Sequence, residues 1–109
     1  MKELTKAEEL ILITIWRLRD NAYGVTIKEK IAETTGKEYA YGTLYALLDQ
    51  LAHKEYIARR TGDPTPERGG RSKTFYGLTL LGIRALKAAV ELHRAVWSGT
   101  DELLMSRDA

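Results

Sequence analysis

The feature that most constrains the fold is a change of hydrophobic period after residue 54. Before it, apolar residues recur at helical spacing; after it come two short runs typical of strands, and then a helical pattern returns. The expected elements are helices over 5–19, 26–36, 39–54 and 80–105, and strands over 57–61 and 73–78. This order predicts a mainly α fold with a two-stranded β-wing, that is, a winged helix-turn-helix with a long C-terminal helix.

Local signals support these helices. Thr5 with Glu8, and Thr26 with Glu29, have the spacing of a capping box, and Gly36 is a natural stop. Gly99 leaves open either a kink in the last helix or its early end. The third helix carries an inward stripe at helical spacing, formed by Leu44, Leu47, Leu48 and Leu51. The first helix is apolar on more than one side, so we expect one side to face the domain's own core and the other a partner.

The length and composition indicate one globular domain. At 109 residues the chain can bury one modest core. We expect residues 1–79 to form the winged helix-turn-helix and residues 80–109 a dimerisation helix packed on the N-terminal helix of the same domain. The absence of cysteine excludes disulfides and thiolate zinc sites. The charged N-terminus and the lack of a long apolar run predict a cytoplasmic protein with no membrane segment.

The loop between the two strands is basic. Its sequence GDPTPERGGR contains two prolines, which prevent continuous strand pairing and predict an extended loop. Three cations and no acid lie between residues 68 and 73, namely Arg68, Arg71 and Lys73. Arginines on such a loop can enter a narrow minor groove or neutralise phosphates. Beside a helix-turn-helix we therefore interpret them as DNA contacts rather than as a solvated loop tip.

The start of the third helix is the expected major-groove element, because the second helix of a helix-turn-helix enters that groove by its N-terminal residues. The candidate DNA contacts there are Lys37, Tyr39, Tyr41, Gly42, Thr43 and Tyr45. Gly42 allows close approach of the backbone, Thr43 can donate to a base edge or a phosphate, and tyrosine hydroxyls suit phosphates. Alternatively, Tyr41 or Tyr45 packs against the neighbouring helix. This segment has no arginine or asparagine for bidentate base reading, so specificity is either modest or based on shape.

At this point the sequence resembles the PadR family of transcriptional regulators. The resemblance is carried by Tyr23-Gly24, GTLYALLDQL (42–51), EYI (55–57), GGRSKTFYGLT (69–79) and Gly82, in order across nearly the whole chain. The short C-terminal part resembles the compact subfamily with one final helix. The resemblance implies a dimeric, double-stranded-DNA-binding repressor that a small molecule or another signal releases from its operator. Gly77 departs from the family, which often has a basic residue there.

A homodimer is also expected from the chain itself. The last helix spreads apolar residues over several faces, including Leu81, Leu86, Val90 and Trp97, and such surplus surface marks interfaces. An effector pocket at the dimer interface, where strips of the first and last helices face each other across the dimer axis, is predicted from Leu10, Ile13, Arg17, Arg94, Trp97 and Asp101. It would take a small planar aromatic or cationic compound. The alternative is that Trp97 is an ordinary interface anchor.

Catalysis is not indicated. His53 and His93 lack ligand partners at metal spacing, so we expect neither a metal nor a cofactor. The sequence has neither a phosphate-binding loop nor a nucleophile elbow. Two function classes stay open. The first is a DNA-binding repressor, and the second is a winged-helix protein-interaction module without DNA binding.

Overall fold

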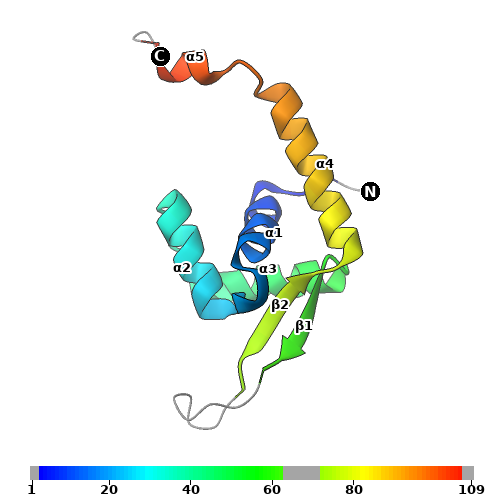
Figure 1. Cartoon of the computed structure of the whole chain (residues 1–109). Coiled ribbons are helices and arrows are strands. Elements are labelled where there is room, and N and C mark those ends of the chain that lie inside the picture. Colours follow the sequence, from blue (N-terminus) through cyan, green and yellow to red (C-terminus); the bar gives the residue numbers. More distant parts are fainter. Residues whose placement is uncertain (1–2, 63–71, 107–109) are drawn as a thin grey trace.

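The computed structural model describes residues 3–62 and 72–106 (Figure 1). In chain order its elements are α1 (Lys6–Leu18), the 3-10 helix η1 (Arg19–Asn21), α2 (Gly24–Thr35), α3 (Tyr41–His53), β1 (Ile57–Thr61), β2 (Thr74–Leu78), α4 (Leu80–Val96) and α5 (Asp101–Leu104). Helices with a two-stranded antiparallel wing confirm the predicted fold class. No helix within the described ranges has the length and apolar character needed to cross a membrane.

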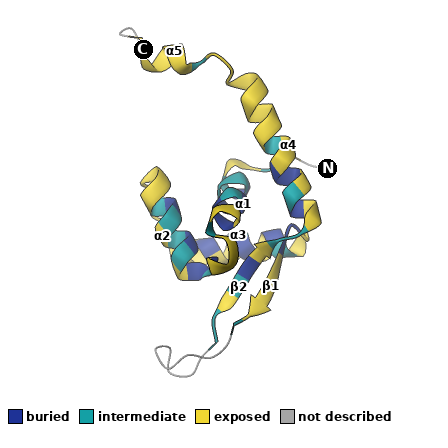
Figure 2. Cartoon of the chain, viewed as in Figure 1, coloured by how far each residue is buried: buried dark blue, intermediate teal, exposed yellow. Residues whose placement is uncertain are grey.

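Helix α1 organises the core, because it contacts α2, α3, α4 and β2. It begins with the predicted capping box: the Thr5 backbone N–H donates to Glu8 Oε1 at 2.8 Å, and the Glu8 N–H donates to Thr5 Oγ1 at 3.1 Å. Ile11, Leu12 and Ile15 are buried against the neighbouring elements. The buried band in Figure 2 accordingly runs through α1, the adjoining face of α3 and the first turns of α4.

Helices α2 and α3 form the helix-turn-helix unit with boundaries that differ slightly from those expected. Helix α2 begins at Gly24, because Thr26 acts from inside the first turn: its Oγ1 accepts the Tyr23 backbone N–H at 3.0 Å. Helix α3 begins at Tyr41 rather than Tyr39, since Ala40 has extended backbone (φ −68°, ψ 146°). The inward stripe is present, with three of its four leucines, Leu44, Leu48 and Leu51, fully buried and Leu47 partly so.

The wing is a regular antiparallel pair that is also tied to the body. Its register pairs Ile57 with Leu78 at the base and Thr61 with Thr74 at the far end. The Tyr76 backbone N–H donates to the Ala22 carbonyl at 2.8 Å, and Tyr23 forms a bridge with Phe75. The segment before α2 therefore lies along the outer edge of β2 and holds the middle of that strand.

Helix α4 starts against the wing and then leaves the body. Its cap is the predicted Thr79, whose Oγ1 accepts the Gly82 N–H at 3.0 Å. The helix ends at Val96, and Gly99 has φ +79°, a conformation that favours glycine and ends the helical path. Of the two outcomes left open for Gly99, the structure shows the early end, followed by the short α5. Figure 2 shows the second half of α4 and α5 as almost wholly exposed.

Candidate nucleic-acid interface and effector groove

The side of α3 that faces away from the core carries the candidate groove-reading residues. We call Tyr41, Gly42, Thr43, Tyr45 and Ala46 the outer face of α3; all five are exposed. The rings of Tyr41 and Tyr45 stack on each other with centroids 6.1 Å apart and planes 23° from parallel. The first turns of the helix thus present a flat aromatic surface beside two small residues and a hydroxyl.

Both readings of Tyr45 have support in its position. A Cβ placed on Gly24 would lie 2.1 Å from Tyr45 Oη, so the hydroxyl sits tightly against the start of α2. The side chain is nevertheless 42% exposed. Tyr45 therefore packs on the neighbouring helix by its hydroxyl end and presents the remainder of its ring outward.

Two other predicted contacts, Tyr39 and Gly42, have contrasting environments. Tyr39 is buried in the segment before α3, and its hydroxyl has no hydrogen-bond partner among the described residues. Its ring therefore belongs to the core, with Lys37 Nζ 5.1 Å from the ring centroid. By contrast, a Cβ added at Gly42 would meet nothing within 4 Å, so the space outside this glycine is open. Nothing in the protein's own packing requires glycine at this position.

The described part of the wing presents one of its three predicted cations. Lys73 Nζ donates to Tyr23 Oη at 3.3 Å and lies 4.3 Å from the centroid of that ring. Arg68 and Arg71 lie outside the described residues. Gly77 lies exposed in β2 with open space around it, so the departure from the family leaves a bare backbone position there.

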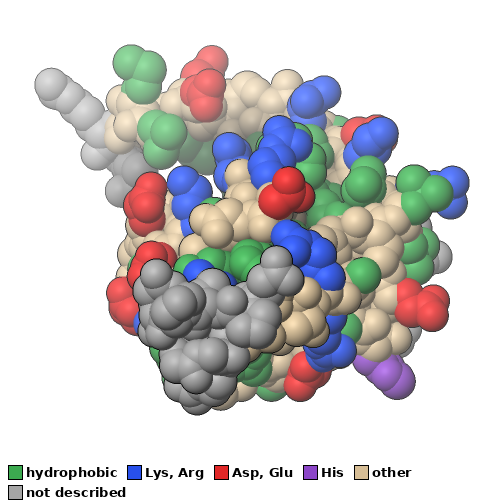
Figure 3. Space-filling model, turned by 60° about the horizontal axis from the view of Figure 1, so that its bottom comes forward, with side chains coloured by type: hydrophobic (Ala, Val, Ile, Leu, Met, Phe, Trp, Pro, Cys, Tyr) green, Lys and Arg blue, Asp and Glu red, His purple; other side chains and the backbone are tan. Residues whose placement is uncertain are grey.

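Three further cations, one on α2 and two on β1, were not among the DNA contacts predicted from the sequence. Lys28 of α2 lies 5.5 Å from the Tyr41 ring centroid and pairs with Glu38 at 3.0 Å. Arg59 and Arg60 project from β1: Arg59 pairs with Asp49 of α3, and Arg60 stacks over Phe75. The signal that could have found the arginines is their position in an exposed strand next to the basic loop. Figure 3, which turns the bottom of Figure 1 forward, shows Lys and Arg side chains distributed among hydrophobic and acidic ones.

A buried carboxylate connects α1 to the end of α3. Glu8 is 1% exposed and accepts from Lys54 Nζ at 2.5 Å and from Gln50 Nε2 at 3.0 Å. Burial by itself raises the pKa of Glu8, but the hydrogen bonds from Lys54, the Thr5 backbone and Gln50 outweigh it and lower the pKa from 4.5 to about 2. The sequence predicted the cap formed by Glu8 and missed its contacts with residues more than forty positions away.

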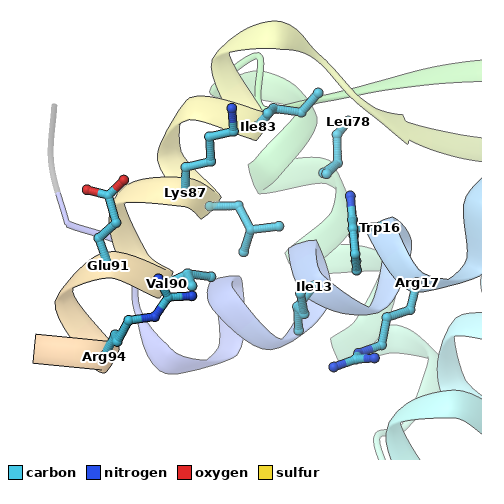
Figure 4. A pocket seen from close by; sticks show the side chains of 10 residues that line it. Ile13, Trp16, Arg17, Leu78, Ile83, Lys87, Val90, Glu91 and Arg94 are labelled. Atoms are coloured by element: carbon cyan, nitrogen blue, oxygen red, sulfur yellow. The ribbon is translucent and has the colours of Figure 1, made fainter. Parts of the chain in front are cut away.

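A groove of about 470 Å³ lies between α1, the end of β2 and α4 (Figure 4). It brings together three of the predicted effector residues, Ile13, Arg17 and Arg94. Leu10 lines a neighbouring depression of about 270 Å³ together with Ile13 and Val90. The remaining lining residues of the larger groove are Trp16, Leu78, Ile83, Leu86, Lys87, Val90 and Glu91.

The indole in this groove belongs to Trp16, whereas the prediction named Trp97. Trp97 is the C-cap of α4 and is 59% exposed, and Asp101 is the first residue of α5. Neither lines the groove of its own subunit. Their assignment to an effector pocket stays a prediction that depends on a second subunit. Within the described ranges, no cluster of three or more His, Asp or Glu side chains is arranged to hold a metal ion.

Known proteins share this fold. A PadR-like transcriptional regulator from Bacillus cereus has a TM-score of 0.74 at 20% identity, covering 93% of each chain. A PadR family transcription regulator from Clostridium difficile gives 0.67 at 24% identity, over 89% of this chain and 97% of the other. RosR from H. salinarum gives 0.70 at 26% identity, over 90% and 81%. The comparison with curated proteins gave no match. Residues 11–88 match the model of the transcriptional regulator PadR-like family, most of the chain, and the protein therefore belongs to this family of DNA-binding transcriptional regulators.

Proposed function

We propose that this regulator is a sequence-specific repressor that binds its operator as a homodimer and is released by a small planar aromatic compound. The observation that carries the proposal is the outer face of α3. It is exposed, the space outside Gly42 in its first turn is open, and Lys28 lies at its edge. In helix-turn-helix docking these first turns enter the major groove, while cations at the rim contact phosphates.

The homodimer is supported by the second half of α4. Beyond the body of the domain this helix exposes Leu92, Val96 and Trp97, with Val96 62% exposed. Apolar surface of this kind on a small chain is typical of an interface. Residues 80–109 would then pair the subunits, and residues 1–79 would bind DNA. A two-fold axis near α4 would present two α3 helices to successive major grooves, roughly 34 Å apart.

The effector proposal is supported by the groove between α1 and α4. Its apolar walls and the Trp16 indole suit a planar aromatic compound. The groove also lies where the DNA-binding part meets the proposed dimerisation helix. A ligand there would change the angle between the two DNA-binding parts and so the DNA affinity, with a coupling of roughly 1–3 kcal/mol. We place the protein in the cytoplasm, where its operator is.

The test of operator binding is a gel shift against the protein's own promoter region, titrated with salt, beside a scrambled duplex of equal length and composition. We expect tighter binding to the promoter DNA, and a logarithmic salt dependence whose slope reports the phosphates neutralised. Deletion of the gene should raise expression from that promoter. No binding to any duplex at low salt would favour the protein-interaction module instead.

The effector proposal is tested by titrating the dimer with a planar aromatic cation and a planar aromatic carboxylate while tryptophan fluorescence is recorded. Both charges are used because the groove carries Arg17, Lys87 and Arg94 beside Glu91. Saturable quenching that is lost in Trp97→Ala but kept in Trp16→Phe would place the ligand at the predicted Trp97. The reverse result would place it in the groove of one subunit. Quenching that never saturates would contradict an effector site.

A further inference from the structure

The outer face of α3 contains neither an amide nor a guanidinium group. It offers the ring surfaces of Tyr41 and Tyr45, the methyl groups of Thr43 and Ala46, and the hydroxyls of Thr43 and Tyr41, while the Tyr45 hydroxyl lies against Gly24. Bidentate reading of guanine requires arginine or lysine, and bidentate reading of adenine requires asparagine or glutamine. The helix that enters the major groove therefore meets the bases mainly with carbon.

The polar side chains further along α3 are already engaged. The Gln50 amide donates to the buried Glu8 carboxylate at 3.0 Å, and the Asp49 carboxylate pairs with Arg59. Turning Gln50 toward an adenine would remove one donor from a carboxylate that is 1% exposed, which is costly. Asp49 would likewise have to leave its arginine to accept from a cytosine. Reading a base would therefore cost each group the partner that it already has.

The cations around the face lie at its margin. Lys28 projects from α2 over the Tyr41 ring, and Lys73 projects from the wing over the Tyr23 ring. In these positions they suit phosphates, whose contacts orient a protein on the duplex without reading sequence. Base discrimination is thereby left to the apolar groups of α3. The apolar feature that distinguishes one base pair from the others in the major groove is the C5 methyl of thymine.

We infer that this regulator recognises thymines in each half-site through their C5 methyl groups, which pack against Thr43 Cγ2, Ala46 Cβ and the stacked rings of Tyr41 and Tyr45. The rings are restrained by their mutual stacking and by the fit of Tyr45 Oη against Gly24, so the surface is formed before DNA arrives. The open space at Gly42 permits the close approach that methyl contacts need. The inference rests on the proposed sequence-specific DNA binding and names the chemistry that it reads.

The test replaces thymine by uracil, one position at a time, in the promoter duplex that the protein binds. Uracil pairs like thymine and lacks only the methyl, so the loss reports that group alone. We expect one or more thymines in each half-site at which uracil weakens binding about fourfold, the effect of losing one buried methyl-sized group. Uracil at flanking positions in the same duplex is the control. Affinity within twofold at every uracil position would overturn the inference.

Two variants of Thr43 assign the effect to α3. Thr43→Ser keeps the hydroxyl and removes the methyl, and Thr43→Val keeps a methyl and removes the hydroxyl. At one thymine, the uracil penalty should disappear in Thr43→Ser and persist in Thr43→Val. The opposite pattern would show that the hydroxyl reads the base there, and a penalty that persists at every thymine in Thr43→Ser and in Ala46→Gly would show that the methyls are read elsewhere. Circular dichroism confirms that each variant is folded.

The outcome also separates this inference from the function on which it rests. Equal affinity for promoter and scrambled duplexes would refute sequence-specific binding and, with it, methyl reading. Preserved preference for the promoter, together with equal affinity for its thymine and uracil forms, would refute methyl reading alone.

Discussion

Two regions of this small chain expose large apolar side chains, and they differ in what surrounds them. The outer face of α3 exposes tyrosines and small residues, with Lys28 at its edge. The second half of α4 exposes aliphatic side chains and Trp97 and projects beyond the body of the domain. Aromatic rings with hydroxyls beside cations suit a polar, charged partner such as DNA. A helix face of leucine and valine suits another apolar face.

The two regions also differ in how the fold supports them. The α3 surface is held from behind by the buried leucine stripe, by Gly24 against Tyr45 and by Glu8 at the far end of the helix. The second half of α4 is supported less: among the described residues His93 pairs with Glu9 of α1 at 2.5 Å, while Leu92, Val96 and Trp97 stay exposed. The first surface is therefore formed in the single chain, whereas we expect a partner to cover the second.

The largest effect is expected from charging the α4 surface. In the double variant Leu92→Glu, Val96→Glu, a two-fold interface would bury four carboxylates, and we expect the dimer to weaken at least about 1,000-fold, roughly 4 kcal/mol. Both residues are more than half exposed in the single chain, so its own stability should change little. Sedimentation velocity over a concentration series measures the effect. Leu80→Glu, at the opposite end of the same helix, is the matched control.

A double variant that stays dimeric at micromolar concentration would place the subunit interface elsewhere. The same variant, if monomeric, should still bind a single half-site, because the α3 surface is formed within one chain. Loss of half-site binding with the fold intact would mean that α4 supports the α3 surface directly.

The next effect concerns Glu8, which links α1 to the far end of α3. Its pKa is lowered in the folded protein from 4.5 to about 2, so it favours folding above the unfolded pKa. That contribution should be lost as the pH falls from about 5 toward 2. Its size at neutral pH is roughly 3 kcal/mol, since each pKa unit corresponds to about 1.4 kcal/mol. Urea unfolding of the wild type and Glu8→Gln from pH 7 to pH 2.5 measures it.

The expected signature is that Glu8→Gln is less stable at pH 7 and approaches the wild type near pH 2.5. Glu33→Gln removes the same charge from an exposed site and should cost less than about 0.5 kcal/mol. A constant difference between wild type and Glu8→Gln at all pH values would mean that packing, not the charge, carries the contribution.

Two helical glycines provide the third prediction. A Cβ at Gly82 would lie 2.0 Å from the Tyr56 carbonyl oxygen, whereas one at Gly42 would meet nothing within 4 Å. Gly82→Ala should therefore lower the free energy of unfolding by roughly 1–3 kcal/mol. Gly42→Ala should raise it by up to about 1 kcal/mol, because alanine favours helix, yet weaken DNA binding by obstructing close approach. Thermal unfolding and gel shifts measure the two effects separately.

If Gly42→Ala is more stable than the wild type but binds DNA more weakly, glycine at this position serves DNA binding rather than folding. If Gly42→Ala bound promoter DNA as tightly as the wild type, the first turn of α3 would not approach the duplex closely. Gly82→Ala acts as the control for a glycine required by the fold.

The sequence predicted most of the fold because its local signals agree with one another. The cap at Thr5, the leucine stripe of α3 and the cap at Thr79 all lie where spacing placed them. Family membership confirms the resemblance drawn from the motifs, and regulators of this family are not enzymes, as predicted. Local spacing could not predict which motifs contact each other in the folded chain. Tyr45 of the GTLY segment fits against Gly24, and Gly82 fits against Tyr56.

The site was harder to predict because it depends on contacts between distant elements. Helical spacing placed Trp97 on a face with Arg94, but the helix ends at Val96, so that face does not continue to Asp101. Trp16 of α1 lines the groove instead. Tyr39 looked like a groove-facing residue because it was assigned to α3, yet it precedes the helix and is buried.

The smallest effect is expected from Lys73 in the wing, because this residue should contribute its charge and no base contact. Lys73→Ala should weaken binding to promoter and scrambled duplexes alike, by less than tenfold, and flatten the logarithmic salt dependence by about one unit. Phosphates carry no sequence information, so the ratio of the two affinities should stay constant. Lys73→Arg keeps the charge and should keep the slope. Arg84→Ala, on α4, lowers the net charge equally and should change the slope less.

Lys73 already lies over the Tyr23 ring. An unchanged slope in Lys73→Ala with a lowered melting temperature would therefore show that this cation holds the wing against Tyr23 and does not contact DNA.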